Sequence, residues 1–156
     1  MKPSLLVRCE TQTAELWQDG KLVKSFPIST ASNGLGCDND SFCTPTGRLR
    51  VAQKIGEGAP FGAVFRSRVW NGEVWSSHRE NPLCLSEEDL VLTRILWLEG
   101  LEEKNANTLD RYIYLHGTNQ ESLLGRPASH GCVRFSNLHI VEIFDLLPIG
   151  AEVEIV

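Results

Sequence analysis

The sequence predicts a mainly β fold with one helix near its end, formed by a single domain over residues 1–156. Most of the chain consists of short runs of apolar and β-branched residues separated by Gly, Asn, Asp and Pro, a pattern typical of strands joined by turns. Only one segment, late in the chain, has a clear helical period. A length of 156 residues with 42% hydrophobic residues is enough for one compact core.

The first third of the sequence indicates a hairpin followed by a long loop and a further strand. An Asp19-Gly20 pair supplies the turn between two apolar runs. Residues 32–47 are rich in Gly, Asn, Asp, Ser and Pro, which predicts a loop of the kind that often borders a functional site. The expected strands are residues 5–8, 14–17, 22–29 and 48–55.

The middle of the sequence continues the β pattern, with one competing signal. Residues 63–69 and 73–75 flank Asn71-Gly72, which predicts a second hairpin turn there. Ser86 followed by acidic residues resembles a helix N-cap, but residues 91–98 have no helical stripe and are predicted to form a strand. Residues 111–116 read as a buried strand that carries His116 at its tip.

The last part of the sequence contains the one convincing helix. Ser136-Asn137 offers a cap, and apolar residues recur at spacings of three and four up to Leu147. Pro148 and Gly150 then end the helix. The alternation over residues 151–156 predicts a final strand.

Charge and cysteine content restrict the partners and the compartment. A formal net charge of −5 without a basic run argues against nucleic acid as a partner, and no membrane segment is expected. The N-terminus lacks a signal-peptide core, and five irregularly spaced cysteines favour reduced thiols. We therefore expect a cytoplasmic protein, or a periplasmic one if a leader peptide has been removed. Whether Cys37 and Cys43 pair is left open.

The residues that could carry out catalysis concentrate around His116 and Cys132. A thiol becomes a strong nucleophile when an imidazole can take its proton, and the two need only be neighbours in space. Gly131 allows a tight turn and a close approach of substrate to the backbone. Backbone amides near Cys132 would then stabilise an oxyanion. The sequence thus predicts a cysteine-nucleophile enzyme that needs no cofactor.

Two other interpretations of these residues remain open. His116, His130 and Cys132 could supply three zinc ligands, although their spacing matches no compact ligand motif and no metal is expected. His130 could support a thiolate, but we expect it to hold its loop through a backbone hydrogen bond. His78 and His139 are interpreted as structural residues.

These motifs resemble the signature of the L,D-transpeptidase catalytic-domain family, also called YkuD-type domains. The resemblance rests on Ser-His-Gly-Cys-Val-Arg at 129–134, Ile-Tyr-Leu-His-Gly-Thr at 113–118 and Gly-Arg-Pro at 125–127. The Thr-Pro-Thr-Gly segment at 44–47 and the apolar residues at 93–98 and 144–150 are also similar to that family. The resemblance covers nearly the whole chain and implies a β-sandwich or barrel-like fold, with the C-terminal helix after the active cysteine.

The resemblance also implies a role for each matching residue. It makes Cys132 the nucleophile that forms a thioester, and His116 the base, oriented by the carbonyl of Gly117. It further implies that Arg134 holds a substrate carboxylate, for which its forked donors are suited, although a structural salt bridge is the alternative. The residues that would shape the site are Ser129, His130 and Gly131.

The resemblance points to peptidoglycan stem peptides, free or sugar-linked, as partners. We expect an L,D-carboxypeptidase of peptidoglycan recycling, which hydrolyses the bond between meso-diaminopimelate and D-alanine in tetrapeptides. The first alternative is an L,D-transpeptidase that forms crosslinks in the periplasm, because the core motif does not decide between water and an amine as the acceptor. The second is a non-catalytic domain that only binds wall peptides.

Overall fold

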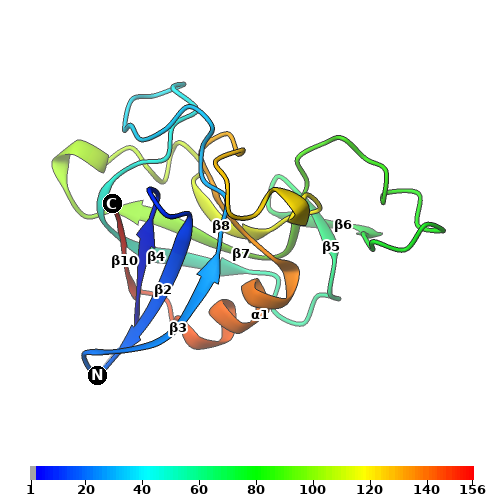
Figure 1. Ribbon diagram of the computed structural model, residues 1–156, viewed down its shortest axis with the longest axis horizontal. Coiled ribbons are helices and arrows are strands. Elements are labelled where there is room, and N and C mark those ends of the chain that lie inside the picture. Colours follow the sequence, from blue (N-terminus) through cyan, green and yellow to red (C-terminus); the bar gives the residue numbers. More distant parts are fainter. Residues whose placement is uncertain (1–2) are drawn as a thin grey trace.

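The computed structural model describes residues 3–156 and confirms a mainly β fold with one C-terminal α-helix (Figure 1). The strands are β1 (Ser4–Arg8), β2 (Thr13–Gln18), β3 (Lys21–Pro27), β4 (Gly47–Ile55), β5 (Ala63–Arg66), β6 (Val69–Val74), β7 (Val91–Gly100), β8 (Tyr114–Gly117), β9 (Val133–Phe135) and β10 (Glu152–Ile155). The helix is α1 (Asn137–Leu146), and two 3₁₀ turns are η1 (Glu103–Asn105) and η2 (Glu121–Leu123).

The strands form one mixed sheet that curls back on itself. Its order is β3-β2-β1-β10-β4-β7-β5-β6, and β8 also pairs with β7 and, on its other side, with β9. Two residues beyond the end of β3, Ser29 bridges Arg134 of β9 in antiparallel fashion. The Ser29 and Arg134 backbones exchange hydrogen bonds of 3.0 and 2.9 Å. This bridge links the β3 end of the sheet to β9, the last strand of the branch through β8, which gives the barrel-like closure that the family resemblance implied.

The core lies inside the curled sheet, where α1 covers β7 and β8 (Figure 1). Alternation along the strands places every second side chain in this core, as in β1 and β2. Apolar residues of the helix and of β8 to β10 complete the packing. Buried members include Ile140, Ile143, Phe144, Leu115, Val133 and Val153.

The N-terminal hairpin follows the sequence prediction. Asp19 and Gly20 both have positive φ, 55° and 74°, as a two-residue turn between twisted strands requires. The pairing of β2 with β3 runs from Thr13–Pro27 to Gln18–Lys21, with an irregularity at Leu16 and Trp17. The predicted loop before β4 is also present, because no strand or helix lies between Pro27 and Gly47.

Two local predictions in the middle of the chain are wrong, whereas the strand predicted over residues 91–98 is confirmed as part of β7. The turn between β5 and β6 is Ser67-Arg68, with φ of 48° and 66°, whereas Asn71 and Gly72 lie inside β6. No helix follows Ser86; that segment extends away from the sheet as an irregular loop (Figure 1, green). The strand that carries His116 begins at Tyr114 rather than at residue 111, because residues 107–112 form consecutive turns.

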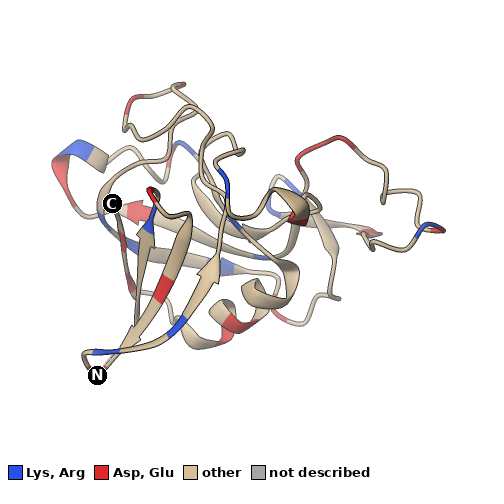
Figure 2. Ribbon diagram, viewed as in Figure 1, with Lys and Arg blue, Asp and Glu red and all other residues tan. Residues whose placement is uncertain are grey.

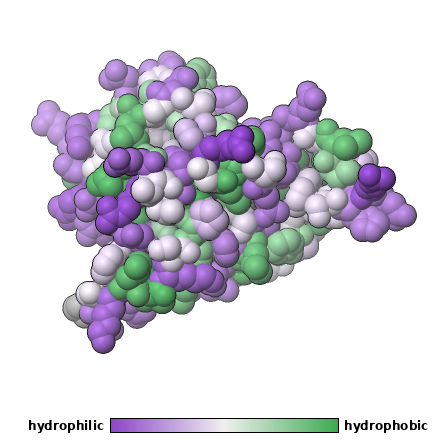
Figure 3. Space-filling model, in the orientation of Figure 1, coloured by the Kyte–Doolittle hydropathy of each residue, from purple (hydrophilic) through white to green (hydrophobic). Residues whose placement is uncertain are grey.

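Charged and apolar residues are spread over the visible surface. Figure 2 marks the positions of basic and acidic residues on the ribbon, where they are interspersed along the strands and loops, and Figure 3 shows apolar surface in separate patches. In residues 3–156, no helix has the length and apolar character needed to cross a membrane.

The N-cap of α1 provides a test of the fold. Ser136 Oγ accepts a 3.1 Å hydrogen bond from the His139 amide. We expect Ser136→Ala to lower the free energy of unfolding by about 1 kcal/mol, because it leaves an amide of the first helical turn without this acceptor. Urea denaturation followed by circular dichroism measures the change. An exposed serine outside the caps, such as Ser25→Ala in β3, is the control, and equal effects of both would contradict the assigned cap.

Candidate active site

The pairing of β8 with β9 brings the two motif regions together. The strands run parallel, with Leu115 opposite Val133 and His116 opposite Arg134. Continued by one residue, this register places Cys132 opposite Tyr114. Because side chains alternate along a strand, His116 and Cys132 share one face of the pair. Strand spacing and rise then separate their Cα atoms by about 8 Å.

The Cys132 thiol is half-buried at the edge of an apolar cluster. Its sulfur accepts a hydrogen bond from the Tyr114 amide at 3.3 Å and donates to the Tyr112 carbonyl at 3.5 Å. Cys132 packs against a cluster that includes Ile95, Tyr114 and Trp97. No hydrogen bond joins Cys132 to His116 among the described residues, so proton transfer requires a small side-chain rotation or a bridging group.

The His116 imidazole is buried and held in one orientation. Its exposed fraction is 2%, and Nδ1 lies 2.6 Å from the Gly117 carbonyl oxygen. A carbonyl oxygen can only accept, so Nδ1 carries the proton. In the neutral ring, Nε2 is therefore unprotonated and able to act as a base. This orientation by Gly117 is the one that the sequence resemblance implied.

The surroundings favour the neutral forms of both groups. Burial lowers the pKa of His116, against the opposing effects of the Gly117 hydrogen bond and the Asp89 charge. Burial raises the pKa of Cys132 to about 12, although the Tyr114 amide and the Arg134 and Arg111 charges oppose this increase. The resting site therefore holds a thiol and a neutral imidazole rather than a preformed ion pair.

The loop before Cys132 is held by hydroxyl groups from two segments. Ser129 Oγ donates to the Cys132 carbonyl at 2.7 Å and accepts from the Gly131 amide at 3.2 Å. Thr44 Oγ1, fully buried, donates to the Gly131 carbonyl at 3.0 Å. Gly131 has φ of 134°, and a Cβ there would lie 3.3 Å from the Cys43 carbonyl oxygen. Ser129 and Gly131 thus position the loop, and the Gly131 amide is occupied rather than free for an oxyanion.

His130 differs from its expected role. Its side chain is 71% exposed, and Nδ1 lies 3.5 Å from Asp89 Oδ2. Its ring also makes an edge contact with Phe42, with centroids 6.2 Å apart. In the described part of the chain, its side chain has no hydrogen bond to the backbone. His130 therefore lies at the surface, beside Asp89 and Phe42.

Arg134 is a structural residue, which corrects the expectation that it holds a substrate carboxylate. Its side chain is 0% exposed, and Nη1 donates to Asp89 Oδ1 at 2.8 Å and to Gln120 Oε1 at 2.6 Å. Nη2 donates to Ser29 Oγ at 3.0 Å. The guanidinium lies on the buried face at the closure of the sheet, so it has no open side for a ligand.

The sequence did not indicate the contacts that support β8, the strand that carries His116. Asn137 Nδ2 donates to the Thr118 carbonyl at 2.8 Å, and Asn137 Oδ1 accepts from Thr93 Oγ1 at 2.6 Å. A Cβ at Gly117 would approach the Leu92 carbonyl oxygen to 2.8 Å, so only glycine fits between β7 and α1. Polar residues at a helix start are common as caps, and nothing in the sequence marks Asn137 as a link to β8.

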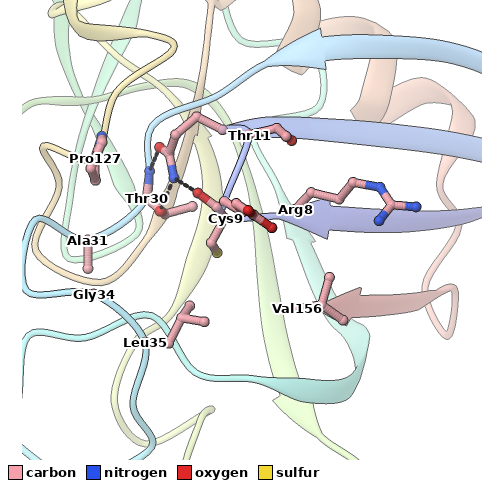
Figure 4. A pocket seen from close by; sticks show the side chains of 11 residues that line it. Arg8, Cys9, Thr11, Thr30, Ala31, Gly34, Leu35, Pro127 and Val156 are labelled. Carbon is pink, nitrogen blue, oxygen red and sulfur yellow. Dashed lines mark hydrogen bonds between the residues drawn. The ribbon is translucent and has the colours of Figure 1, made fainter.

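A cavity of about 520 Å³ lies near the thiol, although neither Cys132 nor His116 lines it, and a second of about 540 Å³ lies elsewhere. The first cavity is lined by Tyr112, Ile113 and His130, and the Tyr112 carbonyl accepts the hydrogen bond from the Cys132 thiol. Figure 4 shows the second cavity, which Cys9, Thr30 and other residues line; Cys132 and His116 are not among them. The first cavity is therefore the candidate substrate site.

The cysteines form no disulfide, and the described residues hold no cluster of metal ligands. All five cysteines are free, so Cys37 and Cys43 do not pair. Within residues 3–156, no three His, Cys, Asp or Glu side chains are grouped as a metal site would require. The zinc hypothesis for His116, His130 and Cys132 therefore has no assembled ligand set.

Comparison with known proteins places these features in one family. The model of the L,D-transpeptidase catalytic domain family (YkuD) matches residues 2–155. A putative L,D-transpeptidase YkuD of Bacillus licheniformis is 39% identical over 152 residues, which are 97% of this chain and 64% of that protein. A putative L,D-transpeptidase YqjB of Bacillus subtilis is 40% identical over 50 residues, 31% of this chain and 28% of that protein.

The fold is also similar to solved structures. An L,D-transpeptidase from Mycobacterium smegmatis superposes with a TM-score of 0.63 at 16% identity, over 99% of this chain and 58% of that one. This chain thus spans less than two thirds of the length of these relatives.

The ion pair of Asp89 with Arg134 provides a stability test. We expect Asp89→Ala to lower the free energy of unfolding by about 2–4 kcal/mol, because it leaves the buried Arg134 charge without a counterion. Chemical denaturation measures this loss. Glu88→Ala is the matched control, since Glu88 pairs with Arg66 on the surface, where both side chains are more than half exposed, and should change stability by less than about 1 kcal/mol. A loss at Asp89 no larger than at Glu88 would contradict the structural assignment of Arg134.

The raised thiol pKa predicts how Cys132 reacts without substrate. Only the thiolate is alkylated, so its rate with iodoacetamide should keep rising with pH beyond 10, since its pKa is about 12. A free cysteine peptide, the control, levels off above its pKa of about 8.5. Mass spectrometry of the Cys132 peptide across a pH series measures the rate. A plateau below pH 8 would instead indicate a preformed thiolate.

Proposed function

This chain belongs to the family of L,D-transpeptidase catalytic domains, and from this premise we propose that it is a cysteine-dependent L,D-carboxypeptidase of peptidoglycan tetrapeptides. The observation that carries the proposal is the shared strand face of Cys132 and His116, with Nδ1 of the imidazole fixed to Gly117 and Nε2 available. The substrate class follows from the family, whose members are named for transfer between L- and D-centres of wall peptides.

In the acylation step, the Cys132 sulfur attacks the carbonyl carbon of the third stem residue. Because both groups start neutral, His116 Nε2 accepts the thiol proton as the S–C bond forms, rather than before. The C–N bond to D-alanine then breaks, and the imidazolium returns the proton to the departing amine. The remaining peptide is held as a thioester.

In the second step, water attacks the thioester and releases a tripeptide and the free thiol. His116 again takes the proton, now from water, and returns it to sulfur. The Asp89 charge raises the pKa of His116 and so favours the imidazolium that forms in both steps, whereas the Arg134 charge opposes it. The hydrogen bond from Nδ1 to Gly117, which leaves Nε2 unprotonated, supports general base catalysis by His116.

We propose that the protein acts in the cytoplasm, on fragments of the wall or on its precursors. Five free cysteines, with none paired, support a reducing compartment. Crosslinking of a mature wall takes place outside the cytoplasm, so this location favours water over a second stem peptide as the acceptor.

Crosslinking is the second candidate function, supported by the family relationship itself. It differs only in the second step, where an amine of another stem peptide replaces water. Both reactions use the same thioester, so the product distinguishes them. A wall-peptide binding domain without catalytic activity is a third candidate. The shared strand face of Cys132 and His116 argues against it, because binding alone does not require a thiol beside an imidazole.

The central experiment is product analysis with a purified tetrapeptide. We expect release of D-alanine and a tripeptide, with no dimer even when an amine acceptor is present, as measured by mass spectrometry. Cys132→Ala should abolish release, and His116→Ala should lower kcat by about 100-fold or more, because each group is required for proton transfer and attack. Cys84→Ala, which alters a thiol outside the site, is the matched control.

Three outcomes would contradict parts of this proposal. Dimers as the main product would favour the transpeptidase. Peptide binding without turnover would favour the passive domain. Full activity of Cys132→Ala would exclude the cysteine mechanism altogether.

A further inference from the structure

Arg68 occupies an unusual position at the tip of the β5–β6 hairpin. Ser67 and Arg68 form the turn with φ of 48° and 66°, a conformation that usually selects glycine, asparagine or aspartate. A left-handed residue with a side chain costs roughly 1–2 kcal/mol. Such strain at a non-glycine residue often accompanies a functional requirement for its side chain.

The Arg68 side chain rests on an aromatic platform beside the thiol. Its guanidinium carbon lies 4.7 Å from the centre of the Trp97 ring and 5.1 Å from that of Tyr112. Nη1 donates to the Tyr114 hydroxyl at 3.2 Å. The rings of Trp97 and Tyr112 lie 5.9 Å apart and tilt by 33°, so they support the cation from one side. The platform fixes the guanidinium without neutralising it.

No carboxylate pairs with Arg68 in the part of the chain that the structure describes, unlike Arg8, Arg48, Arg50, Arg66 and Arg134. Its hydrogen bond to Tyr114 uses one of five N–H donors. Arg68 itself is half-buried, and Tyr112 beside it is 54% exposed. The fork of the guanidinium is therefore available to an anion from solution.

Tyr114 connects this cation to the nucleophile. Its hydroxyl accepts from Arg68, while its backbone amide donates to the Cys132 sulfur at 3.3 Å. Tyr112 does the same from the other side, because its ring contacts Arg68 and its carbonyl accepts from the thiol at 3.5 Å. Arg68 and the sulfur thus lie at opposite ends of the same two tyrosines.

We propose that Arg68 is a specificity residue that binds the terminal carboxylate of the amino acid released from the substrate. In this proposal the released residue, which spans at most about 3.6 Å, runs from a scissile carbonyl at the sulfur toward Arg68. A guanidinium binds a carboxylate through two parallel hydrogen bonds. This inference rests on the proposed function. It assigns carboxylate binding to Arg68, because Arg134 is buried and cannot reach a substrate.

Recognition of a free terminus is tested by comparing two substrates that differ only there. The wild type should cleave a tetrapeptide with a free C-terminal carboxylate more efficiently than its C-terminal amide. Arg68→Met should lower kcat/KM for the free acid by about 10- to 100-fold, mainly through KM, and leave the amide almost unchanged. Arg68→Lys, which keeps the charge but loses the fork, should give an intermediate loss.

Arg66→Met is the matched control for these variants. Arg66 lies two residues earlier, at the end of β5, and pairs with Glu88 on the surface. It removes the same charge from the same hairpin, so it should alter kcat/KM for either substrate by less than about 2-fold. An equal effect of both variants would overturn the specific role of Arg68.

A second measurement does not depend on turnover. Iodoacetate carries a carboxylate and iodoacetamide does not, so an anion site beside Cys132 raises the ratio of their alkylation rates at that thiol. Arg68→Met should lower this ratio roughly 2- to 5-fold relative to the wild type and to Arg66→Met. Mass spectrometry of the Cys132 peptide provides the readout, with the other four thiols as internal references.

The two measurements separate failure of this inference from failure of the proposed function. If the wild type releases no D-alanine but Arg68→Met lowers the alkylation ratio, the carboxypeptidase proposal fails and the carboxylate site stands. If the wild type is active and Arg68→Met changes neither the preference for the free acid nor the alkylation ratio, the inference is overturned.

Discussion

The buried guanidinium of Arg134 is the constraint on which the site depends. It lies where Ser29 bridges β9 and closes the sheet, and it is directly opposite His116 in the β8–β9 pairing. Asp89 and Gln120 bind it from two loops, one before β7 and one after β8. A buried charge is tolerated only where its partners are in place. Closure of the sheet and placement of β8 and β9, which carry the catalytic residues, therefore depend on the same contacts of Arg134.

The low polarity around the thiol has a chemical consequence. It raises the pKa of Cys132 and lowers that of His116, so the free site stores no ion pair. Reactivity then arises when a substrate carbonyl arrives and proton transfer can accompany attack. An unproductive thiolate, open to alkylation or oxidation, is thereby avoided. The hydrogen bond from Nδ1 of the imidazole to Gly117 keeps Nε2 unprotonated, so that it can accept the thiol proton during attack.

Two arginines near the nucleophile show how environment decides function. Arg134 is enclosed, donates through both terminal nitrogens to an acid and to neutral acceptors, and serves the fold. Arg68 stands on aromatic rings with no acid partner and faces the rim. Aromatic faces hold a cation in place but leave its charge available, whereas a carboxylate cancels it. The same side chain thus stabilises a closed sheet in one place and suits ligand binding in the other.

The local features of this protein could be predicted from neighbouring residues in the sequence. Period-two patterns marked the strands, Asp19-Gly20 the first hairpin and Ser136 the helix cap, because each depends on neighbours within a few residues. Cross-strand register overrode local preference at Ser67-Arg68, where the turn formed without glycine. Only the tertiary structure decided that Arg134 is internal, since burial and ion pairing depend on segments far apart in the chain.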